Sequence, residues 1–161
     1  MKKYILLICL SFFGESSFCQ SSVSYPESFT LLNDFILNKS LFKEEIVDWG
    51  SKEGDYGLLW KSDQRSYRVY DLAQFRNRAR ITILYVVDKD MKLKIVRRIA
   101  DNYDKEWNDP TKTIKTTEEY YVFDGGSFKR LGSDLKEISN SSNDNIRKEI
   151  ESLFKAATQS K

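Results

Sequence analysis

Apolar residues recur with a helical period near both ends of the chain. Pro26 suits the first turn of a helix, where its missing N–H group is tolerated. The apolar face that follows consists of Phe29, Leu32, Phe35 and Ile36. Near the other end, residues at spacings of i, i+4, i+7 and i+8 form an amphipathic stripe: Ile146, Ile150, Leu153 and Phe154. The pattern predicts one helix over residues 26–38 and a second, final helix that is capped by Asn143 or by a neighbouring Ser or Asp.

Between these two segments the period changes to two, which is typical of strands. Strands are predicted at 58–61, 66–72, 80–87, 93–99, 119–123 and 127–131. The clearest pair is the hairpin of 80–87, which reads RITILYVV, with 93–99. Asp124-Gly125-Gly126 supplies the turn of a later hairpin. Residues 101–117 are polar and contain Pro110, so a long loop is expected there. Residues 40–47 fit either a short helix or a strand.

This order of elements predicts the α+β class. We expect an antiparallel β-meander sheet of about five to six strands, covered by the N-terminal helix and the C-terminal helix. Alternation along 66–72 places Arg68 and Tyr70 on one face of the sheet and Tyr67, Val69 and Asp71 on the other. If the second face packs inward, Arg68 and Tyr70 point outward.

The first residues have the three-part order of a secretory signal. Lys2 and Lys3 precede an apolar run over 4–13, and the chain then turns polar. The run is shorter than the roughly 20 residues that a membrane-spanning helix needs. We expect cleavage after Cys19, a single domain over 20–161 with no transmembrane segment, and a periplasmic or secreted location.

Two alternatives to a cleaved signal remain open. Cys19 would carry a lipid if the protein were a lipoprotein, but the residue before it is the large Phe18, where a lipobox requires a small residue. Residues 4–13 would otherwise form a buried first helix of a cytosolic protein. The paired lysines and the abrupt polar switch favour export, and the histidine-free, lysine-rich composition is typical of a bacterial envelope protein.

Composition removes most enzyme chemistry. The 161 residues contain no histidine, and both cysteines, Cys9 and Cys19, lie in the predicted signal. Imidazole bases, Ser-His-Asp triads, thiol nucleophiles and His- or Cys-ligated metals are therefore absent from residues 20–161. No glycine-rich phosphate-binding motif is present. We predict a protein that is not an enzyme and that has no cofactor and no metal. The net charge of +2 gives no field that attracts nucleic acid.

Two acidic segments are the remaining candidates for chemistry. Asp48, Glu53 and Asp55 lie among aromatic residues, as the carboxylates of a glycoside hydrolase would. The loop 101–109 alternates acidic residues like the start of a calcium loop, but Asp109 stands where that loop needs glycine, and Lys115 stands where it needs glutamate. Solvated surface acids explain both segments better.

A basic segment over 61–80 is the candidate interaction site. Arginine interleaved with aromatic residues binds anionic partners. The predicted partner-binding residues are Trp60, Arg65, Arg68, Tyr70, Arg76 and Arg78. The partner would be another protein that presents an acidic face. The alternative is that these arginines pair with the acidic loop 101–109 of the same molecule.

Three classes of function follow. The first is an exported, non-catalytic binding protein of the bacterial envelope that docks another protein, as an inhibitor or immunity protein does. The second is a glycan or small-ligand binding module, with the ligand on the sheet or in the gap between sheet and helices. Its stacking candidates are Trp49, Trp60 and Trp107. The third and least favoured is a carboxylate-based hydrolase.

Overall fold

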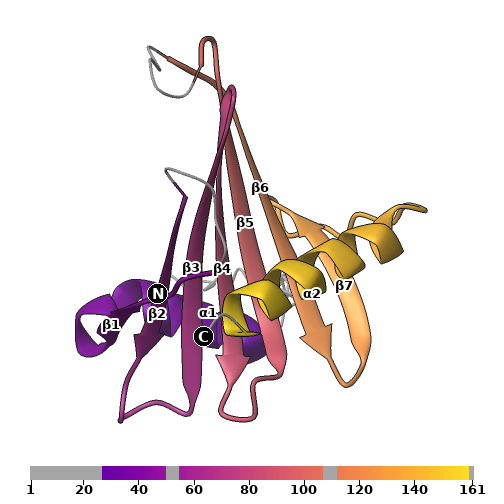
Figure 1. Cartoon of the computed structure of the whole chain (residues 1–161). Coiled ribbons are helices and arrows are strands. Elements are labelled where there is room, and N and C mark those ends of the chain that lie inside the picture. Colours follow the sequence, from indigo (N-terminus) through magenta and orange to yellow (C-terminus); the bar gives the residue numbers. More distant parts are fainter. Residues whose placement is uncertain (1–26, 50–54, 107–111, 160–161) are drawn as a thin grey trace, which may run out of the picture.

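Seven antiparallel strands follow one another both along the chain and across a single sheet (Figure 1). The computed structural model describes residues 27–49, 55–106 and 112–159. In chain order the elements are α1 (Glu27–Leu37), the 3-10 helix η1 (Lys39–Leu41), β1 (Lys43–Ile46), β2 (Tyr56–Lys61), β3 (Tyr67–Arg76), β4 (Ala79–Asp88), β5 (Leu93–Tyr103), β6 (Thr113–Asp124), β7 (Ser127–Gly132) and α2 (Asn143–Gln159). The predicted signal over 1–19 lies outside the described residues.

The α+β class and the β-meander are confirmed, but the sheet has seven strands where five to six were predicted. The additional strand is β1, in the segment that fitted either a helix or a strand. All four residues of β1 are exposed, so no alternation of apolar and polar positions marks it. Its strand conformation comes from pairing with β2, from Lys43 opposite Lys61 to Ile46 opposite Leu58, which is a contact between distant residues.

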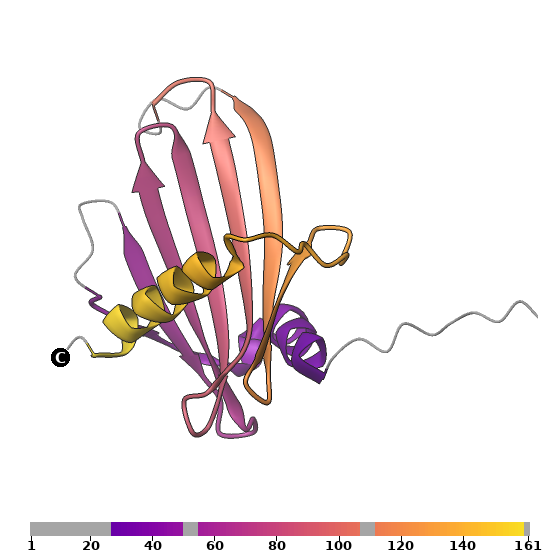
Figure 2. The same ribbon diagram turned by 90° about the vertical axis from the view of Figure 1, so that its right-hand side faces the viewer.

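The prediction of a loop over 101–117 is wrong at both of its ends. β5 continues to Tyr103 and β6 begins at Thr113, and the two strands pair over this polar stretch. Thr116 donates a hydrogen bond to Asp101 across the pair at 2.7 Å. Figure 2 shows the long strands continuing past both helices. Because no helix covers the strands there, polar side chains are compatible with strand structure on either face.

The two helices cover opposite faces of the sheet. In Figure 1, α2 crosses in front of the strands and α1 lies behind them. The core on the α1 side contains Phe29, Leu32, Phe35, Phe42, Trp60, Tyr67, Val69, Leu84, Val86, Ile95 and Val122. The core on the α2 side contains Trp49, Leu59, Tyr70, Leu72, Ile83, Tyr85, Val87, Val96, Tyr121, Ile150 and Ala157. The result is a three-layer arrangement in which the central strands are buried on both faces.

This double burial corrects the expectation for Tyr70. Tyr67 and Val69 do pack inward, against α1, but Tyr70 also packs inward, because its face carries α2. Its side chain is 5% exposed and makes an edge-to-face contact with Phe154 at 5.5 Å between ring centroids. The alternation along the strand was right, and the assumption of one solvent-facing side was wrong.

The terminal helices and hairpin turns agree with the sequence analysis. The apolar stripe of α2 faces the sheet, where Phe154 also stacks on Tyr85 at 5.5 Å. In the turn between β6 and β7, Gly125 and Gly126 both have positive φ, at 53° and 92°. L-residues with a side chain rarely adopt that conformation, so glycine is favoured at both positions.

Replacing Ile95 with aspartate tests the buried face of β5. Ile95 is fully buried in the α1-side core, so Ile95→Asp places an uncompensated carboxylate in an apolar environment at a cost of several kcal/mol. We expect loss of the cooperative thermal transition measured by circular dichroism. Ile114→Asp is the matched control, because Ile114 is 62% exposed on β6 and should melt like the wild type. Unchanged melting of Ile95→Asp would contradict this assignment of faces.

Candidate functional site

The structure does not bring the six predicted partner-binding residues onto one surface. Trp60 is 8% exposed and packs beneath α1, and Tyr70 packs beneath α2. Arg68 and Arg78 are both exposed but lie apart. Arg68 is opposite Val87, near the β4–β5 turn, whereas Arg78 lies in the turn between β3 and β4. The partner-binding role of the exposed arginines stays a prediction.

Arg65 is engaged within the molecule. Its guanidinium donates two hydrogen bonds to Asp34 of α1, from Nε at 2.6 Å and from a terminal nitrogen at 3.1 Å. The Tyr67 hydroxyl donates to the same carboxylate at 2.6 Å. Arg65 therefore ties α1 to the start of β3, and this contact fixes the helix over its face of the sheet.

Arg76 also has an intramolecular partner, Asp55, at 3.8 Å. Asp55 was a candidate for carboxylate catalysis, but its Oδ1 atom accepts a hydrogen bond from the backbone N–H of Phe75 at 2.7 Å. It therefore links the start of β2 to the end of β3. Arg65 and Arg76 therefore pair within the molecule, as the alternative proposed. Their acidic partners, Asp34 and Asp55, are not in the loop 101–109 that the sequence suggested.

The other acidic candidates are only partly described. Glu53, Trp107 and the second half of the loop 101–109 lie outside the described residues. Within the described ranges, no group of three or more acidic, His or Cys side chains comes together as a metal site would require. Those ranges also contain no helix long and apolar enough to cross a membrane.

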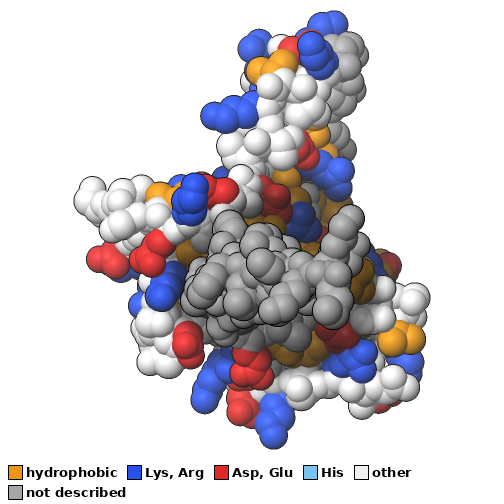
Figure 3. Space-filling view, turned by 180° about the vertical axis from the view of Figure 1, so that it is seen from behind, with side chains coloured by type: hydrophobic (Ala, Val, Ile, Leu, Met, Phe, Trp, Pro, Cys, Tyr) orange, Lys and Arg blue, Asp and Glu red, His pale blue; other side chains and the backbone are white. Residues whose placement is uncertain are grey.

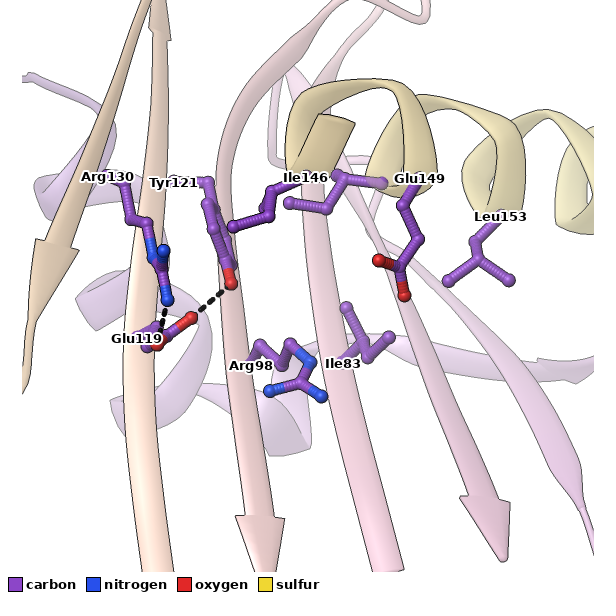
Figure 4. Close-up of a pocket in the computed structure, with 9 residues that line it drawn as sticks. Ile83, Arg98, Glu119, Tyr121, Arg130, Ile146, Glu149 and Leu153 are labelled. Carbon is purple, nitrogen blue, oxygen red and sulfur yellow. Dashed lines mark hydrogen bonds and ion pairs between the residues drawn. The ribbon is translucent and has the colours of Figure 1, made fainter. Parts of the chain in front are cut away.

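A cavity of about 210 Å³ between α2 and the sheet brings together charged and apolar side chains (Figure 4). Its floor is set by the register of neighbouring strands, because Arg98 of β5 lies between Ile83 of β4 and Glu119 of β6. Tyr121 and Arg130 lie opposite each other in the adjacent row. Four residues of α2, which share one side of the helix, form the roof: Ile146, Glu149, Ile150 and Leu153.

Glu119 is the centre of a hydrogen-bonded network at one side of this cavity. Arg130 donates to one of its carboxylate oxygens at 2.6 Å, and the Tyr121 hydroxyl donates to the other. Burial by itself raises the pKa of Glu119, but these two hydrogen bonds and the charges of Arg130 and Arg98 together bring it below its usual range. Glu119 is therefore a stable carboxylate whose two oxygens are already engaged.

Two polar groups, one in the lining of the cavity (Arg130) and one outside that lining (Tyr85), have no hydrogen-bond partner among the described residues. The Tyr85 hydroxyl is buried without one, although it lies close enough to Glu149, Tyr121 and Arg98 for their charges to act on it. Nε of Arg130 is likewise buried and unpartnered. A buried polar group without a partner costs about 1–3 kcal/mol, and such groups gather where a bound molecule supplies the missing bonds.

A second cavity of about 210 Å³ lies on the opposite face, beside α1. Asp71 is its buried acid, and burial raises the pKa of that carboxyl. Lys39 Nζ lies 3.7 Å from the carboxylate and 4.1 Å from the ring centroid of Trp60. Lys39 therefore supplies a counter-charge for Asp71, although Oδ1 of Asp71 is buried without a hydrogen-bond partner among the described residues. The cavity beneath α2 presents both a guanidinium, that of Arg98, and a carboxylate, that of Glu149, without a partner among the described residues. The cavity beneath α2 is the better candidate site.

Sequence reasoning missed Arg98, Glu119, Tyr121 and Arg130 as a group. A partial signal was present, because Arg98 interrupts an otherwise apolar stretch of β5, whereas Glu119 follows a polar stretch of β6. Their meeting depends on the register of β5 against β6, which no local pattern specifies. Comparison of the chain with models of protein families, with curated proteins and with solved structures found no match.

The Asp34–Arg65 contact makes a pH-dependent prediction. Hydrogen bonds from Arg65, and then from Tyr67, lower the pKa of Asp34 from 3.8 to about 2. A depressed pKa contributes stability above the unfolded-state value, and this contribution is lost as the pH falls through the folded-state value. We expect Asp34→Asn to lower the Tm at neutral pH, with the gap to the wild type closing between pH values of about 4 and 2.

Thermal melts of both proteins across this pH range measure the effect. Asp63→Asn is the control, because the Asp63 side chain is 97% exposed and should leave the Tm unchanged. A Tm gap that is independent of pH would mean that Asp34 acts through packing and not through its charge.

Proposed function

We propose that this chain is an exported, non-catalytic binding protein that holds a small organic molecule between α2 and the sheet. The observation that carries the proposal is the cavity of about 210 Å³, which combines unengaged polar groups with an aliphatic wall. Ligand sites combine mostly apolar walls with a few convergent polar groups in this way. Export follows from the predicted signal over residues 1–19.

The chemistry of the site supports binding over catalysis. A general acid or base works best with a pKa near the operating pH. Glu119 has a lowered pKa, and both of its oxygens accept hydrogen bonds, so it is poorly suited to exchange a proton. The absence of histidine from the sequence removes the residue that most often performs this task.

A small molecule fits the described residues better than a glycan does. Glycan sites use aromatic side chains whose faces are open for stacking. Trp49 and Trp60 are both buried in the core. Apart from Tyr121, whose ring stacks on Phe128, the apolar lining of the cavity beneath α2 is aliphatic and includes Ile83, Ile146 and Leu153.

Filling the cavity with a larger side chain should abolish binding. Purified wild-type protein is screened by thermal shift against amino acids, organic acids, amines and sugars of roughly ten non-hydrogen atoms. A ligand present at 100 times its Kd stabilises the folded state by about 2.7 kcal/mol, which is a shift of several degrees. We expect one class to raise the Tm of the wild type but not that of Leu153→Trp.

Ser152→Trp is the matched control for this experiment. It places the same side chain on the same helix at an exposed position outside the cavity, and it should keep the thermal shift. Circular dichroism of the unliganded variants confirms that both fold. A panel in which no class shifts the wild type, or one in which Leu153→Trp responds like Ser152→Trp, would contradict the proposed site.

Docking of another protein is the second candidate, and it has its own support. Leu37, the last residue of α1, is 81% exposed, and Ile46, the last residue of β1, is 87% exposed. β1 also forms one edge of the sheet. Figure 3 views the α1 side and shows acidic and basic side chains interspersed there. Large exposed apolar side chains beside a sheet edge suit a protein partner, and the mixed charges do not suit nucleic acid.

Paired substitutions test this second candidate. If the chain docks a protein, tagged wild-type protein should retain one stoichiometric partner from the envelope fraction of its host. Leu37→Lys combined with Ile46→Lys should then lose that partner. Ile114→Lys is the control, because it changes an exposed isoleucine on β6 in the same way and should keep the partner. Equal capture by the wild type and both variants would mean that Leu37 and Ile46 do not form the docking surface.

A further inference from the structure

Two opposite charges at the cavity beneath α2 remain unengaged. Arg98 projects from β5 and Glu149 from α2, and Figure 4 shows both charged groups beside Ile83. Neither makes a hydrogen bond or ion pair with another described residue. Because Glu119 already accepts from Arg130 and Tyr121, a bound molecule would meet chiefly one free guanidinium and one free carboxylate.

The Tyr85 hydroxyl also has no hydrogen-bond partner among the described residues, but Tyr85 is not one of the residues that line the cavity. The residue is fully buried, and its oxygen lies close enough to Arg98 and Glu149 to respond to their charges. A guanidinium binds a carboxylate through charge-assisted hydrogen bonds. Arg98 therefore suits a carboxylate, and Glu149 suits an ammonium group.

The charge pattern selects a ligand with both groups. A molecule with a carboxylate alone would bring a negative charge toward Glu149, and one with an ammonium alone would bring a positive charge toward Arg98. A zwitterion satisfies both side chains and adds no net charge to a partly buried space.

The walls and the volume define the rest of the ligand. The aliphatic part of the lining consists of Ile83, Ile146, Ile150 and Leu153. An aliphatic cavity of about 150 Å³ accommodates benzene, so the cavity of about 210 Å³ suits a molecule of roughly ten non-hydrogen atoms. A free α-amino acid with a branched aliphatic side chain has this size.

We propose that the cavity beneath α2 binds a free aliphatic α-amino acid, with its carboxylate on Arg98, its ammonium on Glu149 and its side chain against the isoleucines and Leu153. This inference rests on the proposed function, because it names the class of small molecule that the same cavity takes.

Isothermal titration of the purified protein with three matched probes tests the inference. L-Leucine carries both charged groups, 4-methylpentanoate lacks the ammonium, and 3-methylbutylamine lacks the carboxylate. We expect L-leucine to bind at least about tenfold more tightly than either analogue, because each analogue leaves one protein charge unpaired.

Variants assign each charge to its residue. Glu149→Gln should remove the preference for L-leucine over 4-methylpentanoate, and Arg98→Gln should remove the preference over 3-methylbutylamine. The controls are Glu151→Gln on the same helix and Arg68→Gln on the same side of the sheet. Neither control residue lines this cavity, so both variants should keep both preferences.

Three results would overturn the inference. If 4-methylpentanoate binds as tightly as L-leucine and Glu149→Gln has no effect, the site takes organic acids. If L-leucine gives no binding while another compound shows the Leu153→Trp-sensitive thermal shift, the amino-acid assignment is wrong and the proposed function stands. If neither L-leucine nor any compound of the panel binds, both are wrong.

Discussion

Burial of the central strands on both faces is the constraint on which the rest of this structure depends. Val69 and Val86 are fully buried toward α1, and Tyr85 and Val87 are fully buried toward α2. A sheet with apolar side chains on both faces is stable in water only when each face is covered, and burial of this surface is the main favourable term in folding. The two terminal helices supply this cover, and the Asp34–Arg65 contact holds α1 in its place.

The same constraint explains why a polar site exists inside an apolar interface. α2 covers its face of the sheet, and the strands beneath it carry charged residues at two inward positions, Arg98 and Glu119. A fully buried charge needs partners, whereas water can solvate a partly exposed one, and both of these residues are only partly buried. Glu119 has partners in Arg130 and Tyr121, whereas Arg98 does not have a hydrogen-bonded partner among the described residues. This difference between satisfied and unsatisfied groups is what distinguishes the cavity from ordinary core packing.

Much of the architecture was predictable because local patterns report it. The i, i+4 and i+7 stripe of α2 and the runs rich in β-branched and apolar residues in β4 and β5 follow from where each element buries its side chains. The missed parts have no such pattern. β1 is exposed throughout, and the polar ends of β5 and β6 pair beyond the helices, so backbone pairing between distant segments decides their conformation. Tyr70 was placed wrongly because alternation reveals two faces but not whether both are covered.

The sequence by itself determined the α+β class, the order of helices and strands, the hairpin turn at Gly125-Gly126 and the lack of histidine chemistry, since these depend on composition or on residues close together in the chain. Only the tertiary structure decided which faces the helices cover, that Arg65 and Arg76 engage Asp34 and Asp55, and that Arg98, Glu119, Tyr121 and Arg130 meet beneath α2. The physical reason is strand register. A shift of one residue in β5 or β6 would move each of its side chains to the opposite face, and no local sequence pattern specifies that alignment.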